Sequence, residues 1–415
     1  MILLLYFIFF LLILLRYGKK SSIALILVLL QIISLAGCFL INADYPITGL
    51  WDLLNLGFVA LILTVVISPW INVYRVKSID FANEKKVKRL TYFLLIISFF
   101  VFIVLIITSI LVFSLVQDIN EFKYADGVST DFYYQLPINV KLFILSTYLY
   151  NFSYFLIPLH FFYLSKEKWA LSILCLIFSL NIVLYGLTYF SRSVFVHYLL
   201  IYISFLYILY NALTERTRGI IKKVLISAGS LFAVYFVYVT IQRFTNDTLY
   251  ANTIPAKSFI QEPVLYSCFD YLSQWYYNGM YILHSYKFTT FQGQISLQPI
   301  LSLLGQYGII GYDTMRYANL RQQLWPLHWF TFNGLVGYSV YDYGYILTLF
   351  FSFIYYYIVK RFQPKAGRLS LIHLFYIVLL IQIPLMAIFY SAVAGIIVPF
   401  LLMIPIGLYL KIRVE

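Results

Sequence analysis

Residues 85–116 read KKVKRLTYFLLIISFFVFIVLIITSILVFSLV, a basic stretch followed by 26 residues, 91–116, without a single charged side chain. The hydrocarbon core of a bilayer is about 30 Å thick, and an α-helix needs ~20 mostly apolar residues to cross it. The stretch therefore predicts a membrane-spanning helix. The preceding lysines and arginines predict that this end of the helix faces the cytoplasm, because cytoplasmic links carry an excess of basic residues.

Segments of the same kind recur along the whole chain. Apolar residues make up 62% of the 415 residues and charged residues 11%, where a soluble domain has roughly half and a quarter. We therefore expect an all-α polytopic membrane protein in which residues 1–415 form a single transmembrane domain. Its eleven spanning segments are predicted at about 2–15, 22–41, 51–71, 91–116, 141–164, 169–190, 194–213, 224–242, 335–359, 371–390 and 394–410.

The charges between these segments predict the orientation. If the link 16–21 is cytoplasmic, the links on that side hold 21 of the 29 Lys and Arg residues and net +16, whereas the other side nets −3. By the positive-inside rule the N-terminus lies on the outer side and the C-terminus in the cytoplasm. The net charge of +13 does not indicate nucleic acid as a partner, because the basic links are short, separated and also meet anionic membrane lipids.

One outer link, residues 243–334, is 92 residues long. Loops of such length are usually functional in a compact protein. Amphipathic stretches at 266–283 and 296–310 predict that this loop is folded and lies on the outer face, and Asp313 is the predicted N-cap of a helix over 314–324. Its clustered aromatic residues either stack on sugar faces or belong to the ordinary interfacial belt. These are Trp275, Tyr276, Tyr277, Trp325 and Trp329.

Arginine is the residue that the positive-inside rule depletes from the outer side, yet Arg192, Arg243, Arg316 and Arg321 are all predicted there. Arg192 occupies a very tight link before the segment 194–213, so its guanidinium lies beside a helix N-terminus. A fixed guanidinium and the amides of a helix start together favour a phosphate or pyrophosphate. The alternative is that these arginines pair with acidic side chains or with lipid headgroups.

Two further outer residues could carry chemistry. Asp342 lies at the outer boundary of the segment 335–359, where a carboxylate costs about 2.5 to 3.5 kcal/mol unless it is paired. It therefore either pairs with one of the arginines or binds and deprotonates a hydroxyl. His328 lies among aromatic residues just before the same segment, and a neutral imidazole is suited to general-base work. An interfacial histidine without a catalytic role is the alternative there.

Residues 328–344, HWFTFNGLVGYSVYDYG, resemble the end of the large periplasmic loop in Wzy-type oligosaccharide repeat-unit polymerases, where a Thr-Phe-x-Gly stretch leads to an Asp-aromatic-Gly at the next helix. The link 189–193, YFSRS, is similar to the Arg-containing turn that this family and the O-antigen ligases carry after a mid-chain helix. The number of helices and the position of the long loop extend the resemblance over most of the chain.

The resemblance implies a GT-C-like fold in the bacterial inner membrane. It implies an enzyme that polymerises polyprenyl-pyrophosphate-linked oligosaccharides into O-antigen or capsule at the periplasmic face, releasing polyprenyl pyrophosphate. No metal, nucleotide sugar or other cofactor is implied, and a protein that sets chain length is an expected partner. Arg192 carries over best as a pyrophosphate ligand, Arg243 next, and Arg316 and Arg321 as loop arginines. Ligases place a His-Asn or His-Ser before the corresponding helix, whereas Trp329 follows His328 here. A ligase and a lipid-linked glycan flippase stay as alternatives.

Overall fold

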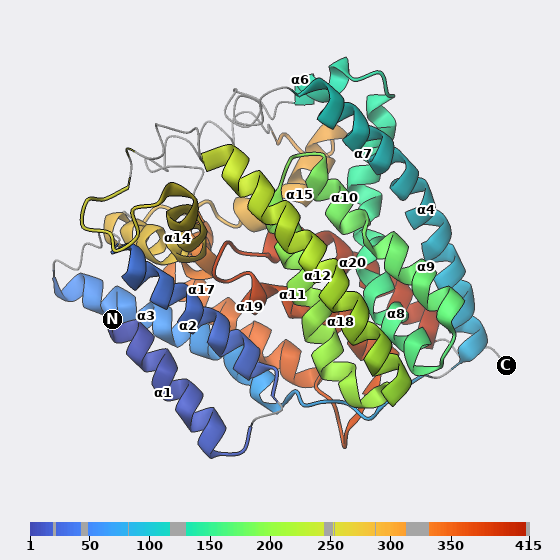
Figure 1. Ribbon diagram of the computed structural model, residues 1–415, viewed down its shortest axis with the longest axis horizontal. Helices are drawn as coiled ribbons and strands as arrows, with labels where there is room; N and C mark the ends of the chain where they lie inside the picture. Colours follow the sequence, from blue (N-terminus) through green and yellow to red (C-terminus); the bar gives the residue numbers. More distant parts are fainter. Residues whose placement is uncertain are drawn as a thin grey trace. The chain divides into compact units, whose positions relative to one another are not determined.

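The computed structural model of the chain describes residues 1–19, 22–42, 49–81, 83–116, 130–244, 252, 254–286, 288–312 and 332–411. Helices dominate these residues (Figure 1). Eight helical stretches of the described part are long and apolar enough to cross a membrane, and two shorter apolar helices accompany them. The chain is therefore a helical, multi-pass membrane protein, as its sequence predicts. The number of eleven spans stays a prediction.

Every predicted segment lies largely on helix, in several cases as two or three consecutive pieces. The N-terminal half contains α1 (Ile2–Arg16), α2 (Ala24–Ile41), α3 (Leu50–Ile67), the 3-10 helix η1 (Ser68–Asn72), α4 (Glu84–Leu115), α6 (Thr130–Gln135), α7 (Val140–Leu149), η2 (Tyr150–Phe155), α8 (Leu156–Ser165), α9 (Trp169–Ser179), α10 (Asn181–Leu187) and α11 (Arg192–Leu209). The C-terminal half contains η3 (Tyr210–Ala212), α12 (Glu215–Phe244), α14 (Pro263–Ser285), α15 (Gln294–Gln306), α17 (Gly334–Arg361), α18 (Leu371–Leu380), α19 (Gln382–Leu385) and α20 (Val393–Lys411). The strands β1 (Ser78–Asp80) and β2 (Arg368–Ser370) are three residues long and pair in parallel.

The helix α4 shows why the apolar segments fold in this way. It begins at Glu84, seven residues before the predicted segment, because the side chain of Asn83 accepts a hydrogen bond from the amide of Lys86 at 3.2 Å and caps the helix. Beyond Arg89 its large exposed side chains are apolar, among them Ile96 at 70% and Ile110 at 63% exposure. A helix that is apolar on its inner and outer faces requires lipid around it.

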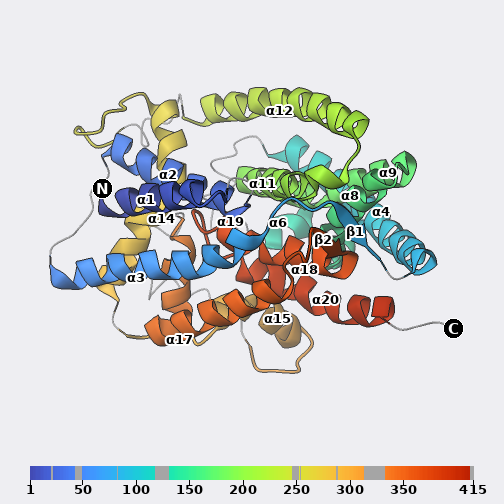
Figure 2. The ribbon, with the colours of Figure 1, turned by 90° about the horizontal axis from the view of Figure 1, so that it is seen from below.

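The chain forms two compact units. Unit 1 comprises residues 1–74, 240–363 and 380–398, and unit 2 comprises residues 75–239, 364–379 and 399–415. In unit 1 the loop helix α14 runs across α2 and α3 and also packs on α17 (Figure 2). The predicted amphipathic stretch 266–283 is therefore helical, and one of its faces is buried within unit 1.

Hydrogen bonds and small residues hold α14 close to its neighbours. Ser34 in α2 donates to the carbonyl of Leu272 at 2.5 Å and accepts a hydrogen bond from the indole of Trp275. The crossing of α14 and α17 depends on two glycines, since a Cβ on Gly337 would lie 3.1 Å from the Cα of Gly279. A Cβ on Gly279 would lie 2.9 Å from the carbonyl oxygen of Asn333. Small residues let helix backbones approach in membrane proteins.

Two of the predicted segments are interrupted in unit 1. The helix predicted over 335–359 is broken at Gly344, whose φ of 77° lies in the left-handed region that favours glycine. The segment 371–390 is helical only to Leu385. The carbonyls of Ala387 and Phe389 then accept the amides of Leu335 and Gly334, each at 3.0 Å, at the start of α17. Irregular backbone is tolerated at such places because it is buried in protein and hydrogen-bonded.

Unit 2 is built around a buried polar junction between helices. The side chain of Asn181, at the start of α10, donates to the carbonyl of Ser98 at 2.8 Å and to the hydroxyl of Ser153 at 3.1 Å. The predicted segments 141–164 and 169–190 are both interrupted, the first by η2 and the second at Leu180 between α9 and α10. Short 3-10 pieces of this kind mark places where a helix adjusts to its neighbours.

The glycine at the α14–α17 crossing gives a test of this packing. Gly279→Ala should destabilise the detergent-purified protein by about 1 to 3 kcal/mol, because the added methyl group meets backbone that cannot move aside easily. Gly57→Ala in α3 is the matched control, since nothing lies within 4 Å of its Cβ position. Thermal unfolding should show a lower midpoint for Gly279→Ala and an unchanged or slightly higher one for Gly57→Ala. Equal midpoints would contradict the described crossing.

Candidate functional site

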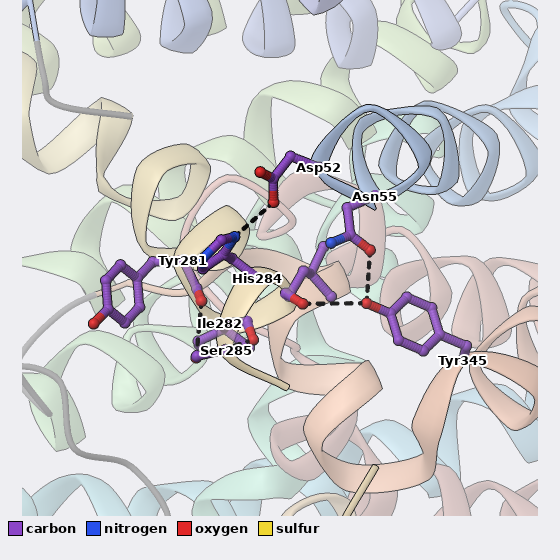
Figure 3. Close-up of polar contacts among 8 residues, drawn as sticks. Asp52, Asn55, Tyr281, Ile282, His284, Ser285 and Tyr345 are labelled. Carbon is purple, nitrogen blue, oxygen red and sulfur yellow. Dashed lines mark hydrogen bonds and ion pairs between the residues drawn. The ribbon is translucent and has the colours of Figure 1, made fainter. Parts of the chain in front are cut away.

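A buried carboxylate meets a part-exposed imidazole where α3 and α14 approach each other in unit 1 (Figure 3). Nδ1 of His284 lies 2.7 Å from Oδ1 of Asp52, although the two residues are 232 positions apart. The side chain of Asp52 is 2% exposed and that of His284 is 41% exposed. The carboxylate is thus withdrawn from solvent, while the imidazole is accessible to a second molecule.

The ends of the two helices suit these side chains. Asp52 lies in the first turn of α3, where the helix dipole stabilises a negative charge. His284 lies in the last turn of α14, where the dipole stabilises a protonated imidazole. An ionised carboxylate only accepts hydrogen bonds, so Nδ1 carries the proton and Nε2 of the neutral ring is an acceptor. Nε2 has no hydrogen-bond partner among the residues that the structure describes.

A second polar contact joins α3 to α17 one turn further along. The hydroxyl of Tyr345 donates to Oδ1 of Asn55 at 2.7 Å, as Figure 3 shows. Asn55 is 1% exposed, and its Nδ2 has no hydrogen-bond partner within the described part of the chain. A buried amide donor without a partner costs about 1 to 3 kcal/mol.

Aromatic rings border the same site. The ring of Trp51 lies 5.8 Å from that of Tyr345 and 6.2 Å from that of Phe288. Trp51 is 40% exposed and Phe288 is 73% exposed, so both present open faces. Burial, with a smaller contribution from Tyr341, raises the pKa of neighbouring Tyr286, so its hydroxyl stays protonated at neutral pH. Such a wall can stack against the apolar face of a sugar ring.

The predicted aromatic cluster has a different role. Trp275 and Tyr276 are 3% and 7% exposed, and they pack in the interior of unit 1. Tyr277 donates a hydrogen bond to the carboxylate of Asp270, whereas Trp325 and Trp329 lie outside the described residues. Neither the membrane belt nor sugar stacking therefore accounts for Trp275 and Tyr276, which are core residues.

Asp342 caps a helix. It is 1% exposed, and its two carboxylate oxygens accept the amides of Ile295 at 3.0 Å and Ser296 at 2.9 Å, at the start of α15. Its own carbonyl accepts the amide of Gly293 at 3.1 Å. The carboxylate is thus stabilised by backbone amides at a helix N-terminus, which is neither of the two predicted partners, and its pairing with an arginine stays a prediction. Gly344, two residues later, breaks α17 and lets the chain turn around this cap.

The other predicted site residues are placed only in part. Arg192 is the first residue of α11 in unit 2, after Phe190 with a φ of 49° and Ser191, whose amide donates to the carbonyl of Gly186 at 2.8 Å. The predicted tight turn before a helix is therefore present. Arg243 lies in the last turn of α12. The side chains of these two arginines, and the whole of Arg316, Arg321 and His328, lie outside what the structure describes.

The helix α14 also holds the chain where the segment 313–331 ends. Gln274 donates to the carboxylate of Asp270 at 2.7 Å and accepts the amide of Phe332 at 3.3 Å. Asn278 donates to the carbonyl of Phe332 at 3.2 Å. One face of α14 therefore fixes the residue that follows the segment carrying Arg316, Arg321 and His328, while His284 near its C-terminal end contacts Asp52.

The contact of Asp52 with His284 was missed in the sequence. A lone acid at the start of the apolar segment 51–71 is a recognisable signal, because ionisable residues in membrane helices are costly and usually functional. Its partner is not visible in the sequence, since their pairing depends on α14 folding back onto α3.

No protein-family model, curated protein or solved structure matches the chain.

The cap at α15 gives a second test. Asp342→Ala should lower the free energy of unfolding by about 3 kcal/mol, because a buried and a part-buried amide lose charge-assisted hydrogen bonds. Glu262→Ala is the matched control, since Glu262 caps α14 in the same way from an exposed position and should cost about 1 kcal/mol. Chemical denaturation in detergent measures both. An Asp342 variant no less stable than the Glu262 variant would show that the cap is not a strong anchor.

Proposed function

We propose that this protein is a membrane glycosyltransferase that polymerises polyprenyl-pyrophosphate-linked oligosaccharides into O-antigen or capsular polysaccharide. It acts at the periplasmic face of the bacterial inner membrane, with a GT-C-like fold of about eleven spans. The observation that carries the proposal is the hydrogen bond between Asp52 and His284, because polymerisation needs a base for the acceptor hydroxyl. The motifs at 189–193 and 328–344 supply the family resemblance.

In the proposed reaction, Nε2 of His284 accepts the proton of an acceptor sugar hydroxyl as the oxygen attacks the anomeric carbon of the donor. The bond between that carbon and the pyrophosphate oxygen breaks, and polyprenyl pyrophosphate leaves with the bonding electrons. The imidazolium that forms is stabilised by the carboxylate of Asp52, which also fixes the orientation of the ring. Cleavage of the donor linkage drives the step, so no ATP is required.

The donor is held by arginines in this proposal. By the family resemblance Arg192 is the first ligand of the pyrophosphate, and Arg243, Arg316 and Arg321 add positive charge. The leaving group gains negative charge in the transition state, and preorganised guanidinium groups at a low-dielectric boundary stabilise it strongly. Trp51 and Phe288 stack on the sugar beside the base. Asp342 acts through the cap of α15 and positions the loop, and His328 stays a second candidate for the base.

The predicted orientation is consistent with this assignment. The N-terminal end of α3 and the helix α14 of the long loop 243–334 are both predicted on the outer side. The base and the lipid-linked substrate, once flipped to that side, then share one compartment. The N-terminus is periplasmic and the C-terminus cytoplasmic in this arrangement, and a protein that sets chain length is the expected partner.

A flippase for lipid-linked glycans is the second candidate, because a buried carboxylate next to a histidine is also the arrangement of a proton relay in transporters. The two candidates differ in what they need. A polymerase lengthens lipid-linked oligosaccharide in detergent solution, where no sealed compartment exists, whereas a flippase yields no product there. Chain growth in detergent supports the polymerase, and transbilayer movement in proteoliposomes without chain growth supports the flippase. A ligase would transfer finished polymer to a lipid acceptor and leave repeat units unjoined.

Removing the base should abolish most of the turnover. We expect His284→Ala to lower kcat for chain growth at least ~100-fold, which is the lower range for general-base catalysis, with KM for the donor little changed. The assay uses purified protein in detergent with a synthetic polyprenyl-pyrophosphate oligosaccharide. His373→Ala, which removes a histidine from unit 2, is the control and should keep its activity. Wild-type turnover in His284→Ala would exclude His284 as the base.

The arginine assignment has its own test. Arg192→Ala should abolish long polysaccharide chains in cells while the protein stays in the membrane at a normal level. Arg192→Lys should rescue poorly, because an ammonium lacks the bidentate fork of a guanidinium. Gel separation of the surface polysaccharide reads out the chain-length distribution. Full rescue by lysine would show that Arg192 acts only through its positive charge. Normal chain-length ladders from both variants would exclude Arg192 from donor binding.

A further inference from the structure

Unit 2 contains a groove at the turn between α11 and α12, and none of its lining residues belongs to the site described above. Figure 2 shows that the chain leaves the end of α11 and turns, and that α12 runs back in the opposite direction. The groove has a volume of about 560 Å³. It is lined by Leu206, Tyr210, Glu215, Arg218, Lys222 and Ile226, among others.

The lining residues are ordered by polarity along the groove. Arg218, Lys222 and Ile226 follow one another at a spacing of four residues, so they form a single stripe along α12. Leu206 near the end of α11 and Tyr210, the first residue of η3, are spaced in the same way. The groove is therefore cationic near the turn and apolar one to two helical turns further in. A molecule with an anionic head and a hydrocarbon chain would match these two parts of the groove.

Two guanidinium groups converge on one aromatic ring at the cationic end. Arg218 lies 4.6 Å from the centroid of the Tyr210 ring, and its Nε donates to the Tyr210 carbonyl at 2.9 Å. Arg75 lies 5.0 Å from the same centroid and 4.7 Å from that of Tyr207. Stacking on tyrosine fixes the planes of both guanidinium groups without neutralising them. Their remaining N–H groups are available to an anion.

The charges at this end are not balanced. Nε of Arg75 is buried without a hydrogen-bond partner among the described residues. Arg218 and Lys222 in the lining and Arg75, which stacks on the same Tyr210 ring, bring three positive charges. Two acids oppose them, Glu215 in the lining and Glu167, which accepts a hydrogen bond from Thr214 at 3.2 Å beside it. Fixed guanidinium groups with spare donors match the oxygens of a phosphate, and a phosphate would offset the excess charge.

We propose that this groove binds one membrane lipid through its phosphate headgroup, with Arg75, Arg218 and Lys222 around the phosphate and a hydrocarbon chain along Leu206 and Ile226. The proposal does not depend on the catalytic one, because it involves none of the same residues. Two sources share this chemistry, an anionic glycerophospholipid and a polyprenyl phosphate. Binding of either lipid in the groove differs from the general attraction of basic links to a membrane, because a single molecule is held in a defined place.

The test is native mass spectrometry of the full-length protein in detergent, titrated with phosphatidylglycerol, polyprenyl phosphate or phosphatidylcholine. We expect one tightly bound molecule of phosphatidylglycerol or of polyprenyl phosphate, and the tighter binder identifies the source. Arg218→Gln together with Lys222→Gln should weaken that first binding step about tenfold or more. Arg216→Gln together with Lys223→Gln is the matched control, because it removes the same charge from the same helix outside the groove lining.

Equal losses in the two double variants would overturn the proposal, because they would show attraction to net charge rather than a built site. Equal binding of phosphatidylcholine would overturn it as well. Arg75→Gln provides a second readout from a different element and should weaken the same first step. A loss of chain growth with lipid binding intact concerns the catalytic proposal alone, so failures of the two proposals can be told apart.

Discussion

The contact between the carboxylate of Asp52 and the imidazole of His284 is the interaction on which the account of this protein depends. An ionised carboxylate withdrawn from water is costly unless it is paired, and here the start of α3 and the ring of His284 both compensate for it. The same contact ties a helix of the long loop to a membrane helix. The attachment of α14 to α3 and the proposed catalysis therefore both depend on this one pair of side chains.

The long loop is part of the fold of unit 1 rather than an appendage. Its helix α14 is bound to α2 through Ser34, crosses α17 at Gly279 and Gly337, and holds the chain at Phe332. Its helix α15 is capped by Asp342. A loop fixed at so many points can present side chains with little freedom, and such preorganisation is what general-base and electrostatic catalysis require.

Local signals predicted much of this arrangement. Apolar length identified the membrane helices, and periodicity identified α14, because both properties are read from neighbouring residues. The breaks at Gly344 and after Leu385 were not predicted, because the hydrogen bonds that compensate for them come from segments that are distant in the sequence. Asp342 was expected to pair with an arginine or a hydroxyl, whereas the partners that the structure describes are backbone amides, which no residue type reveals in a sequence. The pairing of Asp52 with His284 was not predictable because it depends on α14 folding back onto α3.

The most direct test of the account is a double-mutant cycle on the rate of chain growth. If Asp52 and His284 act as one unit, Asp52→Asn and His284→Ala each slow the reaction, and the double variant is no slower than His284→Ala alone. Multiplied effects, with the double variant slower by the product of the two single losses, would show that the residues act independently. We expect the first result, and the second would contradict a shared role of Asp52 and His284 in catalysis.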